Sequence, residues 1–296
     1  MERLTASVPI DVAHFTDPGC PWAWSASPAH AVLRWRYGDA LRWRLVMIGL
    51  TERAEQYVAR GYTPAGQALG YMRFRRYGMP FAAAPRRRIG ATGRACRAVV
   101  ATRLLDPPRE EHVFRALQLG MFTDGLVLDD DADIARALER VNGLDVRAVL
   151  AALGDPEVER RYEADRAEAR TAAGSATELQ GKAARTDGPV RYTAPSLVFQ
   201  ADGRRLEAGG FQPVEAYDVV VANLDPALPR RDPPDHALDV LRAAPFALAT
   251  AEVAAVLARG NDAPDRGAAE AQLIELVAAG DAVREAAGDG ALWSAS

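Results

Sequence analysis

The sequence predicts an α/β fold that carries an inserted helical lobe and a small C-terminal unit. The chain opens with a strand, a turn, a helix and a second strand within residues 10–48, and strands return at residues 195–208. The stretch between them, about residues 51–188, has the apolar spacing of helices and is too long for a loop. A proline-rich linker at residues 225–235 then precedes the last unit, residues 236–296.

Length and composition are those of an ordinary globular protein. The 296 residues allow one large domain or two, and we predict two units, residues 1–224 and the C-terminal unit. Hydrophobic residues make up 49% of the chain and charged residues 26%, as is usual for globular proteins. No apolar run reaches the roughly 18 residues of a membrane-spanning helix. Residues 1–8 hold no apolar segment of a secretory signal. We therefore expect a cytoplasmic protein with no membrane partner.

Cysteine count and charge exclude several classes of site. Cys20 and Cys96 are too few for a disulfide scaffold in a chain of this length, and we expect free thiols. The four histidines are scattered, so no metal site is predicted. The formal net charge is −4, and residues 236–296 hold nine acidic residues against four arginines. Nucleic acid is not an expected partner, because phosphate contacts need a basic surface.

The first elements follow from local patterns. Residues 10–15 have the alternation and β-branched content of a strand. Residues 16–21 form a turn cluster, and residues 22–37 have helical apolar spacing that ends at Gly38. Residues 41–48 place their large apolar side chains on one face and indicate a second strand.

Five segments of the lobe have helical patterns. Prolines followed by acidic residues mark two helix starts, at residues 107–111 and 155–157, because acidic side chains suit the positive end of a helix dipole. The predicted helices of the lobe are residues 95–105, 110–121, 131–141, 146–152 and 156–173.

Strands and helices are also predicted after the lobe, both at the end of the domain and in the C-terminal unit. A hairpin is predicted at residues 195–208 around Asp202-Gly203, followed by a helix at residues 213–223. Three helices and two short strands in the C-terminal unit suggest a winged-helix-like shape, for which packing or a homodimer contact is the expected role. The predicted elements of this unit are helices at residues 236–242, 250–258 and 266–278 and strands within residues 280–293.

Cys20 is the residue around which the chemistry is predicted. It follows a strand and a turn and stands at the first turn of a helix, where free backbone N–H groups and the helix dipole favour a thiolate. A free cysteine has a pKa near ~8.5, so a decrease of about two units would make it mostly thiolate at neutral pH. Pro21 costs no hydrogen bond at a helix start, and Trp22 offers an apolar wall beside the sulfur.

The segment Cys20-Pro21-Trp22-Ala23 resembles the Cys-Pro-x-Cys site of the DsbA family of thioredoxin-fold proteins, and especially its cytoplasmic, actinobacterial branch. Residues 38–50 and 193–199 carry the same resemblance. It implies a thioredoxin-like core with the helical lobe inserted in it. It also implies that Pro195 follows a cis peptide bond and faces the cysteine; an ordinary trans proline at a strand start is the alternative. The C-terminal unit resembles a winged-helix extension of some relatives.

The departure from the family pattern lies at Ala23, where redox-active relatives have a second cysteine. Cys20 cannot close the usual intramolecular disulfide, so a mixed disulfide on Cys20 needs another thiol to resolve it. The candidates are a low-molecular-weight thiol (mycothiol or glutathione), a partner protein, and Cys96. The predicted function is that of a monothiol oxidoreductase or thiol transferase. Its predicted substrate-binding residues are Pro21, Trp22, Ala194 and Pro195.

Two other functions fit the same residues. A non-redox transferase or isomerase of the kappa glutathione transferase type handles a small thiol with one hydroxyl or thiol, and would have a cofactor-sized pocket between core and lobe. A non-catalytic binding protein on a degenerate thioredoxin fold would bury Cys20 and leave the pKa of its thiol normal or raised.

Individual residues also have simpler interpretations. Cys96 reads as a small buried residue of a helix. His14 is predicted to be a half-exposed strand residue rather than a group that lowers or raises the pKa of the thiol. Asp17 is predicted to start the turn. Of Trp22 and Trp24, one is expected to line the site and the other to lie in the core.

Overall fold

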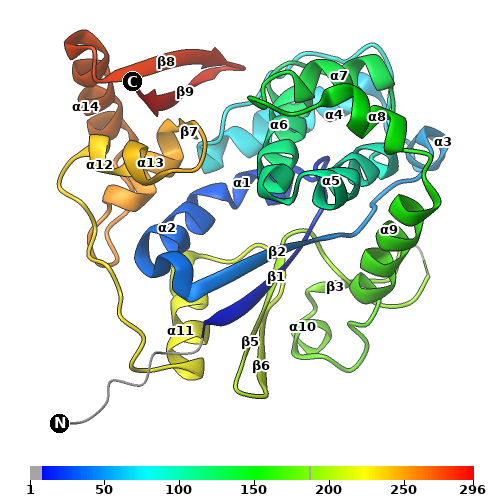
Figure 1. The fold of residues 1–296 in the computed structure, drawn as a ribbon, viewed down its shortest axis with the longest axis horizontal. Helices are drawn as coiled ribbons and strands as arrows, with labels where there is room; N and C mark the ends of the chain where they lie inside the picture. Colours follow the sequence, from blue (N-terminus) through cyan, green and yellow to red (C-terminus); the bar gives the residue numbers. More distant parts are fainter. Residues whose placement is uncertain (1–8, 187) are drawn as a thin grey trace.

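The computed structural model describes residues 9–186 and 188–296 of the chain (Figure 1). The compartment prediction made from residues 1–8 lies outside the described residues. A four-stranded sheet forms the core, in the order β2-β1-β5-β6, with β1 parallel to β2 and antiparallel to β5. Its strands are β1 (Ile10–Thr16), β2 (Leu41–Met47), β5 (Ser196–Ala201) and β6 (Arg204–Ala208).

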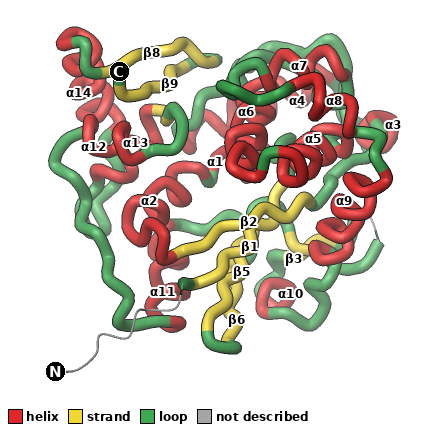
Figure 2. The backbone as a smooth tube through the Cα atoms, in the orientation of Figure 1, coloured by secondary structure: helices red, strands yellow, loops and turns green. Residues whose placement is uncertain are grey.

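Three helices of the core accompany this sheet (Figure 2): α1 (Pro21–Ser25), α2 (Ser27–Tyr37) and α11 (Val214–Leu224). The sequence predicted one helix over residues 22–37, but the helix breaks at Ala26. The physical reason is Pro28, which has no N–H to donate to the carbonyl of Trp24 four residues earlier. The short α1 is thus a separate element that begins directly after Cys20.

The two faces of the sheet carry different clusters. On one face, Val12 and Phe199 of the strands pack with Leu33 of α2 and Tyr217 of α11. Side chains alternate along a strand, so the neighbouring residues of β1 point to the opposite face. There Phe15 belongs to a second apolar cluster, which contains Cys20.

The lobe between β2 and β5 is helical, as predicted, with the bounds shifted by a few residues. Helices α3, α4 and α10 were not predicted individually, and strand β3, which pairs with β4, forms within the stretch that was predicted to be helical. The helical pattern ends at Gly181, whose φ of +68° follows the last turn of α10. No helix among the described residues is long and apolar enough to cross a membrane. The elements of the lobe are α3 (Ala54–Val58), α4 (Pro64–Phe74), α5 (Gly93–Leu105), α6 (Glu110–Phe122), α7 (Asp131–Leu138), α8 (Val146–Ala152), α9 (Pro156–Ala169), α10 (Ala176–Leu179), β3 (Ala183–Ala184) and β4 (Arg191–Tyr192), with single 3-10 turns at Arg75–Tyr77 and Pro107–Arg109. A further 3-10 turn, Gly38–Ala40, follows α2 in the core.

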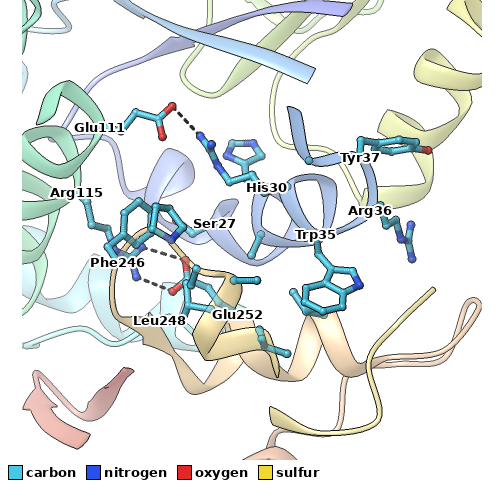
Figure 3. Close-up of a pocket in the computed structure, with 18 of the residues that line it drawn as sticks. Ser27, His30, Trp35, Arg36, Tyr37, Glu111, Arg115, Phe246, Leu248 and Glu252 are labelled. Atoms are coloured by element: carbon cyan, nitrogen blue, oxygen red, sulfur yellow. Dashed lines mark hydrogen bonds and ion pairs between the residues drawn. The ribbon is translucent and has the colours of Figure 1, made fainter. Parts of the chain in front are cut away.

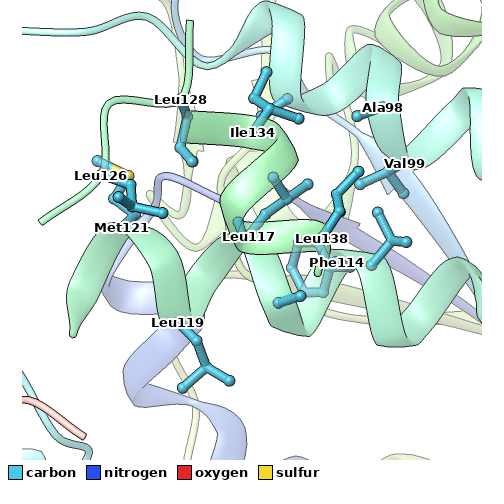
Figure 4. Close-up of a cluster of buried hydrophobic side chains, with 14 of the residues drawn as sticks. Ala98, Val99, Phe114, Leu117, Leu119, Met121, Leu126, Leu128, Ile134 and Leu138 are labelled. Atoms are coloured by element: carbon cyan, nitrogen blue, oxygen red, sulfur yellow. The ribbon is translucent and has the colours of Figure 1, made fainter. Parts of the chain in front are cut away.

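The lobe has a hydrophobic core of its own (Figure 4). Val99 of α5, Leu117 of α6 and Ile134 of α7 pack there with no exposed surface. Trp24 of α1 and Met47 of β2 belong to the same cluster. The lobe core therefore continues into the α/β core next to the segment that carries Cys20.

The C-terminal unit contains the three predicted helices and the predicted hairpin. One additional strand, β7, pairs antiparallel with β9, so the small sheet has the order β7-β9-β8. Its elements are α12 (Ala237–Ala243), β7 (Leu248–Ala249), α13 (Thr250–Leu257), α14 (Arg266–Ala279), β8 (Ala282–Ala287) and β9 (Gly290–Ala295).

This unit packs against both other parts of the molecule. Trp293 shares an apolar cluster with Val32 of α2, and Leu292 belongs to the core of the lobe. The carboxylate of Glu252 forms a buried ion pair with Arg115 of α6 at 2.5 Å. The packing role expected for the unit is thus present within one chain, and the homodimer contact stays a prediction.

Candidate functional site

Cys20 lies where the sequence placed it, between the turn after β1 and the start of α1. It is the N-cap residue of α1, and its backbone N–H donates to the carbonyl oxygen of Asp17 at 3.1 Å. Gly19 allows this turn to lie close to the lobe, because it has no Cβ. A Cβ added there would lie only 2.3 Å from a methyl carbon of Thr92, which is too close for two carbon atoms. Cys20 itself is only 5% exposed. The thiol is therefore enclosed between the sheet and the lobe.

The environment of Cys20 keeps its thiol neutral. Its Sγ donates a hydrogen bond to the carbonyl oxygen of Ala194 at 3.1 Å. Burial raises the pKa of the Cys20 thiol to about 12, although the N–H groups at the start of α1 act to lower it. From the sequence, the helix N-terminus was expected to dominate and lower this pKa. The loss of hydration on burial has the larger effect on the pKa, because two backbone N–H donors replace only part of the hydration that a thiolate has in water.

The loop before β5 supplies the other side of the Cys20 contact. The Ala194–Pro195 peptide bond is cis, as the resemblance implied. Ala194 is buried in the same apolar cluster as Cys20 and Tyr192. Of the predicted site residues, the structure therefore brings Cys20 into direct contact with Ala194, the residue that precedes Pro195.

Asp17 has a larger role than the turn start that the sequence indicated. It has no exposed surface, and its Oδ1 accepts a hydrogen bond from the N–H of Gly19 at 2.8 Å. Its Oδ2 accepts hydrogen bonds from the N–H of Leu50 and the hydroxyl of Thr92, each at 2.8 Å. Burial raises the pKa of Asp17, and these hydrogen bonds oppose the rise. Asp17 thereby joins the turn before Cys20 to the segment after β2 and to the start of α5.

Cys96 is buried in α5, as its simpler interpretation predicted. Its Sγ lies 3.5 Å from Oδ2 of Asp17. Burial, and then the carboxylate of Asp17, raise the pKa of this thiol well above its ordinary value. Both cysteines are free thiols. Cys96 as the resolving thiol stays a prediction.

In the described part of the chain, no group of three or more histidine, cysteine or acidic residues is arranged to hold a metal ion.

The two tryptophans of α1 separate as predicted. Trp24 has no exposed surface, and its Nε1 donates to the carbonyl oxygen of Pro80 at 2.9 Å. Trp22, two residues after Cys20, is 40% exposed and packs against three other rings with centroid separations of 4.8 to 5.6 Å. These rings come from segments far from Trp22 in the sequence, so no local pattern around Trp22 indicates the contact. We call this group the aromatic surface, and its members are Trp22, Phe74, Tyr77 and Phe211.

His14 does not belong to the Cys20 site. It is 6% exposed rather than half-exposed, because His30 of α2 covers it with a centroid separation of 4.7 Å. Its neighbours Ala13 and Phe15 share the cluster of Cys20, whereas His14 lines a cavity on the α2 side. Cys20 does not line that cavity. The cavity does lie between α2 of the core and α6 of the lobe, where a kappa-type transferase was expected to have a pocket, so that alternative stays open.

Comparisons with known proteins agree with this geometry. The family model described as "DSBA-like thioredoxin domain" matches residues 11–173. Among solved structures, the cytosolic disulfide reductase DsbM from Pseudomonas aeruginosa matches with a TM-score of 0.51 and 16% identity, over 73% of this chain and 100% of that one. A probable DsbA oxidoreductase from Streptomyces coelicolor matches with a TM-score of 0.54 and 19% identity, over 76% and 93% of the two chains. The fold is thus thioredoxin-like, with an inserted helical lobe.

One relative is similar over a longer part of the chain. The ClpXP adapter protein SpxH of Shouchella clausii is 26% identical over 262 residues, which cover 86% of this chain and 80% of the relative. Residues 1–224 make up a smaller share of the chain than this. The similarity therefore extends into the C-terminal unit.

Proposed function

Because this chain belongs to the family of DSBA-like thioredoxin domains, we propose that it carries out thiol–disulfide exchange through one thiol, that of Cys20. The observation that carries the proposal is the 3.1 Å contact between Cys20 Sγ and the carbonyl oxygen of Ala194, at the N-terminus of α1. Helix N–H groups adjoin the sulfur there, and the backbone before Pro195 borders it. With Ala23 in place of a second cysteine, the exchange is limited to one thiol.

The proposed exchange has two balanced steps. The Cys20 thiol gives up its proton, and the thiolate attacks a disulfide R–S–S–R′. A mixed disulfide between Cys20 and R forms, and R′ leaves as a thiolate that takes up the proton. A second thiol, R″–SH, then attacks the sulfur of R as its thiolate. This step releases the disulfide R–S–S–R″ and restores the Cys20 thiol.

We assign the second thiol to a small molecule such as mycothiol or glutathione rather than to Cys96. The Cys96 thiol is fully buried, and its pKa is raised well above the ordinary value, so it forms a thiolate with difficulty. The half-exposed Trp22, two residues after Cys20, marks the side from which we propose that a small thiol approaches. We place the exchange in the cytoplasm, which the free state of both cysteines and the cytosolic DsbM neighbour support.

The raised pKa of Cys20 determines how this exchange depends on pH. With a pKa of about 12, the thiolate fraction at pH 7 is on the order of 10⁻⁵, against a few per cent for an ordinary cysteine. The rate should therefore be low at neutral pH. It should keep rising about tenfold per pH unit above pH ~8.5, where an ordinary thiol begins to level off.

The experiment uses the full chain with Cys96→Ala, in which Cys20 is the one remaining cysteine. Oxidised glutathione is added between pH 7 and 10, and the mixed disulfide is followed by intact mass. The same chain with Cys20→Ser is the blank, and a sample unfolded in urea gives the rate of an ordinary thiol. We expect one adduct, slower than in the unfolded sample, with a rate that rises throughout the range. No adduct on the folded protein at pH 10, while the unfolded sample reacts, would contradict exchange through Cys20.

A second candidate function is non-catalytic protein binding. A buried Cys20 with a raised pKa is what the sequence analysis expected of such a protein. The similarity to an adapter protein that extends into the C-terminal unit also favours it. Cys20→Ser distinguishes the two functions, because it abolishes exchange but leaves a binding surface such as the aromatic surface intact. Binding to ClpXP, measured by titration with the full chain, would therefore be unchanged in Cys20→Ser and weakened in Trp22→Ala.

A further inference from the structure

A cavity lies between the core, the lobe and the C-terminal unit (Figure 3). Its volume is about 620 Å³, within the range of roughly 300–1,000 Å³ that is typical of small-molecule sites. Neither Cys20 nor Pro195 lines it, so a ligand held there does not need the proposed exchange site. Its main walls come from residues 27–35 of α2, residues 111–118 of α6 and residues 243–256 of the C-terminal unit.

The way α6 lies along α1 and α2 defines the two ends of this cavity. Near the start of α6, Glu111 forms an ion pair with Arg34 of α2 at 2.9 Å. At the end of α6, Phe122 stacks on Trp24 of α1 with a centroid separation of 5.9 Å. Helix α6 therefore runs from the C-terminal end of α2 back toward α1. The cavity has an inner end next to α1 and an outer end next to the last turn of α2.

The inner end holds two neutral polar side chains. Ser27 is the first residue of α2, and Gln118 lies one turn before the end of α6. Gln118 is only 3% exposed, and no described residue forms a hydrogen bond with its amide or with the hydroxyl of Ser27. These polar atoms are not fully enclosed by protein, so they open on the cavity that both residues line. Because buried polar groups are normally paired, they indicate a place for a neutral polar group of a ligand.

The space between the two ends has apolar walls. Phe114 lies midway along the part of α6 that lines the cavity, and Phe246 and Leu248 line it from the C-terminal unit. The lining residues of α2 extend from Ser27 to Trp35, which is about 12 Å along a helix that rises 1.5 Å per residue. An apolar ligand body that contacts both ends is therefore elongated.

The outer end contains an arginine that is available to a ligand. The guanidinium carbon of Arg231 lies 4.6 Å from the ring centroid of Trp35. The backbone N–H of Arg231 donates to the carbonyl oxygen of Arg36 at 2.8 Å, which places this segment over the C-terminal end of α2. Arg231 is exposed, and no acidic residue of the described chain forms an ion pair with it. A ligand carboxylate there would gain a charge-assisted hydrogen bond.

Most other charges of the lining are paired within the protein. Five arginines line the cavity against three acidic residues. Asp218, outside the lining, is shared by Arg36 and Arg230, so these two guanidiniums together have one carboxylate. The two histidines of the lining are uncharged at neutral pH, because burial lowers the pKa of both. The remaining ion pairs are Arg34 with Glu111 and Arg115 with Glu252.

Asp39 is the lining acid that forms no ion pair with a described basic residue. It is exposed on the 3-10 turn after α2, at the outer end, and would repel a bound carboxylate. With Asp39 and Asp218 both counted, the arginines still exceed the acids by one. The charge around the cavity therefore favours an anion over a cation, and Asp39 lowers the affinity for an anion without reversing this order.

We propose that this cavity binds an elongated apolar carboxylate that carries a neutral hydrogen-bonding group at its far end. The carboxylate lies at the outer end beside Arg231. The neutral group contacts Ser27 and Gln118 at the inner end, and the apolar body lies between them against Phe114 and Phe246. The site does not depend on the chemistry of Cys20.

Four rigid probes of one shape test the proposal on the full chain by titration calorimetry. The full probe is biphenyl with a carboxylate at one end and a hydroxyl group at the other. One analogue lacks the hydroxyl group, one has a carboxamide in place of the carboxylate, and one has a cationic aminomethyl group there. We expect the full probe to bind about fivefold more tightly than the first two analogues, and the cation to bind most weakly. Equal or tighter binding of the carboxamide or the cation would overturn the proposal, as would no measurable binding of the full probe at millimolar concentration.

Two variants test the inner end. Gln118→Met removes the amide from a side chain of similar length, so we expect it to weaken binding of the full probe about fivefold. Binding of the analogue without the hydroxyl group should stay within about twofold, because that analogue makes no hydrogen bond there. Unchanged affinity for the full probe in Gln118→Met would refute the assignment of this end. Ser27→Ala serves in its place if Gln118→Met fails to fold.

Three variants test the charges of the outer end. Arg231→Met should weaken binding of the full probe about fivefold and leave the carboxamide within about twofold. Asp39→Asn should strengthen binding of the full probe, because it removes a like charge. Arg136→Met makes the same change as Arg231→Met at an exposed arginine of α7 outside the lining, and should bind as the parent does. Equal affinities for the full probe in Arg231→Met and Arg136→Met would refute the carboxylate site.

Discussion

At the scale of single residues, Asp17 controls the geometry around Cys20. Its two carboxylate oxygens accept three hydrogen bonds from three separate segments, and the thiol of Cys96, one turn along α5 from Thr92, lies 3.5 Å from Oδ2. A carboxylate without exposed surface is stable only when such donors replace its lost hydration. Asp17 therefore stabilises the fold as well as the turn that presents the thiol.

Asp17→Asn should lower the free energy of unfolding by about 3 kcal/mol. The amide keeps one oxygen for Gly19, but its NH₂ group then faces the N–H of Leu50, so two donors oppose each other. Urea unfolding of the full chain measures the change. Asp39→Asn is the control, because Asp39 is exposed on the 3-10 turn after α2, and it should leave stability unchanged. A loss below about 1 kcal/mol in Asp17→Asn would contradict this role.

Residue roles could be predicted from the sequence only where the signal is local. Cys20 and Trp22 stand in one short motif, and the structure places both at the start of α1. The hydrogen bonds of Asp17 to Leu50 and Thr92 join positions far apart in sequence, so no local pattern contains them. His14 was predicted to be half-exposed because strand alternation alone does not show which helix covers a face.

At the scale of elements, the turn between β8 and β9 holds the C-terminal unit against the lobe. Asp289 accepts a hydrogen bond from the N–H of Phe81 at 2.7 Å and forms an ion pair with Arg75 at 2.5 Å. Gly288, with a φ of +54°, sits so close that a Cβ would lie 2.8 Å from the carbonyl carbon of Phe81. The neighbouring Arg75 and Tyr77 segment contributes to the aromatic surface, so this turn also supports the surroundings of Trp22.

Gly288→Ala should destabilise the protein more than a glycine substitution elsewhere. Gly260 is the matched control, because its φ of +55° is nearly the same but nothing lies within 4 Å of an added Cβ. Gly260→Ala should cost about 1 kcal/mol, the strain of a left-handed alanine. Gly288→Ala should cost at least about 1 kcal/mol more, because backbone atoms cannot move aside as a flexible side chain can. Equal costs in urea unfolding would show that the hairpin turn is free to move away from Phe81.

Elements were predicted well where their ends carry strong signals. Asp145 and Asp155 cap α8 and α9 with side-chain hydrogen bonds, and both starts were predicted correctly. Helices α3 and α4 were missed because α3 is only 5 residues long and α4 carries two glycines in its sequence, which weaken the helical pattern. The break at Ala26 was missed because Pro28 stands one residue into α2, where a proline is also compatible with a helix start.

At the scale of the whole molecule, the C-terminal unit is part of the same folded body as the lobe. The linker and the charge of this unit suggested a separate module, but Ala249, Ala251 and Leu292 lie in the lobe core. The buried Arg115–Glu252 pair joins residues 137 positions apart in the chain. Contacts at such separation leave no trace in local sequence patterns, so they could not be predicted. We therefore expect the domain and the C-terminal unit to unfold in one transition.

Glu252→Gln tests this expectation, because it leaves the guanidinium of Arg115 buried without an anion. The side chains of Arg115 and Glu252 are 6% and 2% exposed, and removing one partner of such a pair costs about 3–5 kcal/mol. The oxygen that accepts the N–H of Ala249 at 2.7 Å is retained, so the start of α13 keeps its cap. Urea unfolding, followed by tryptophan fluorescence and by circular dichroism, should shift as one coincident transition.

Two further variants serve as controls. Asp235→Asn, which breaks the exposed pair with Arg259, should change stability by less than about 1 kcal/mol. Adding Arg115→Met to Glu252→Gln should recover part of the loss, since no buried charge is then unpaired. Two separate transitions, or no loss in Glu252→Gln, would mean that the C-terminal unit folds independently of the lobe.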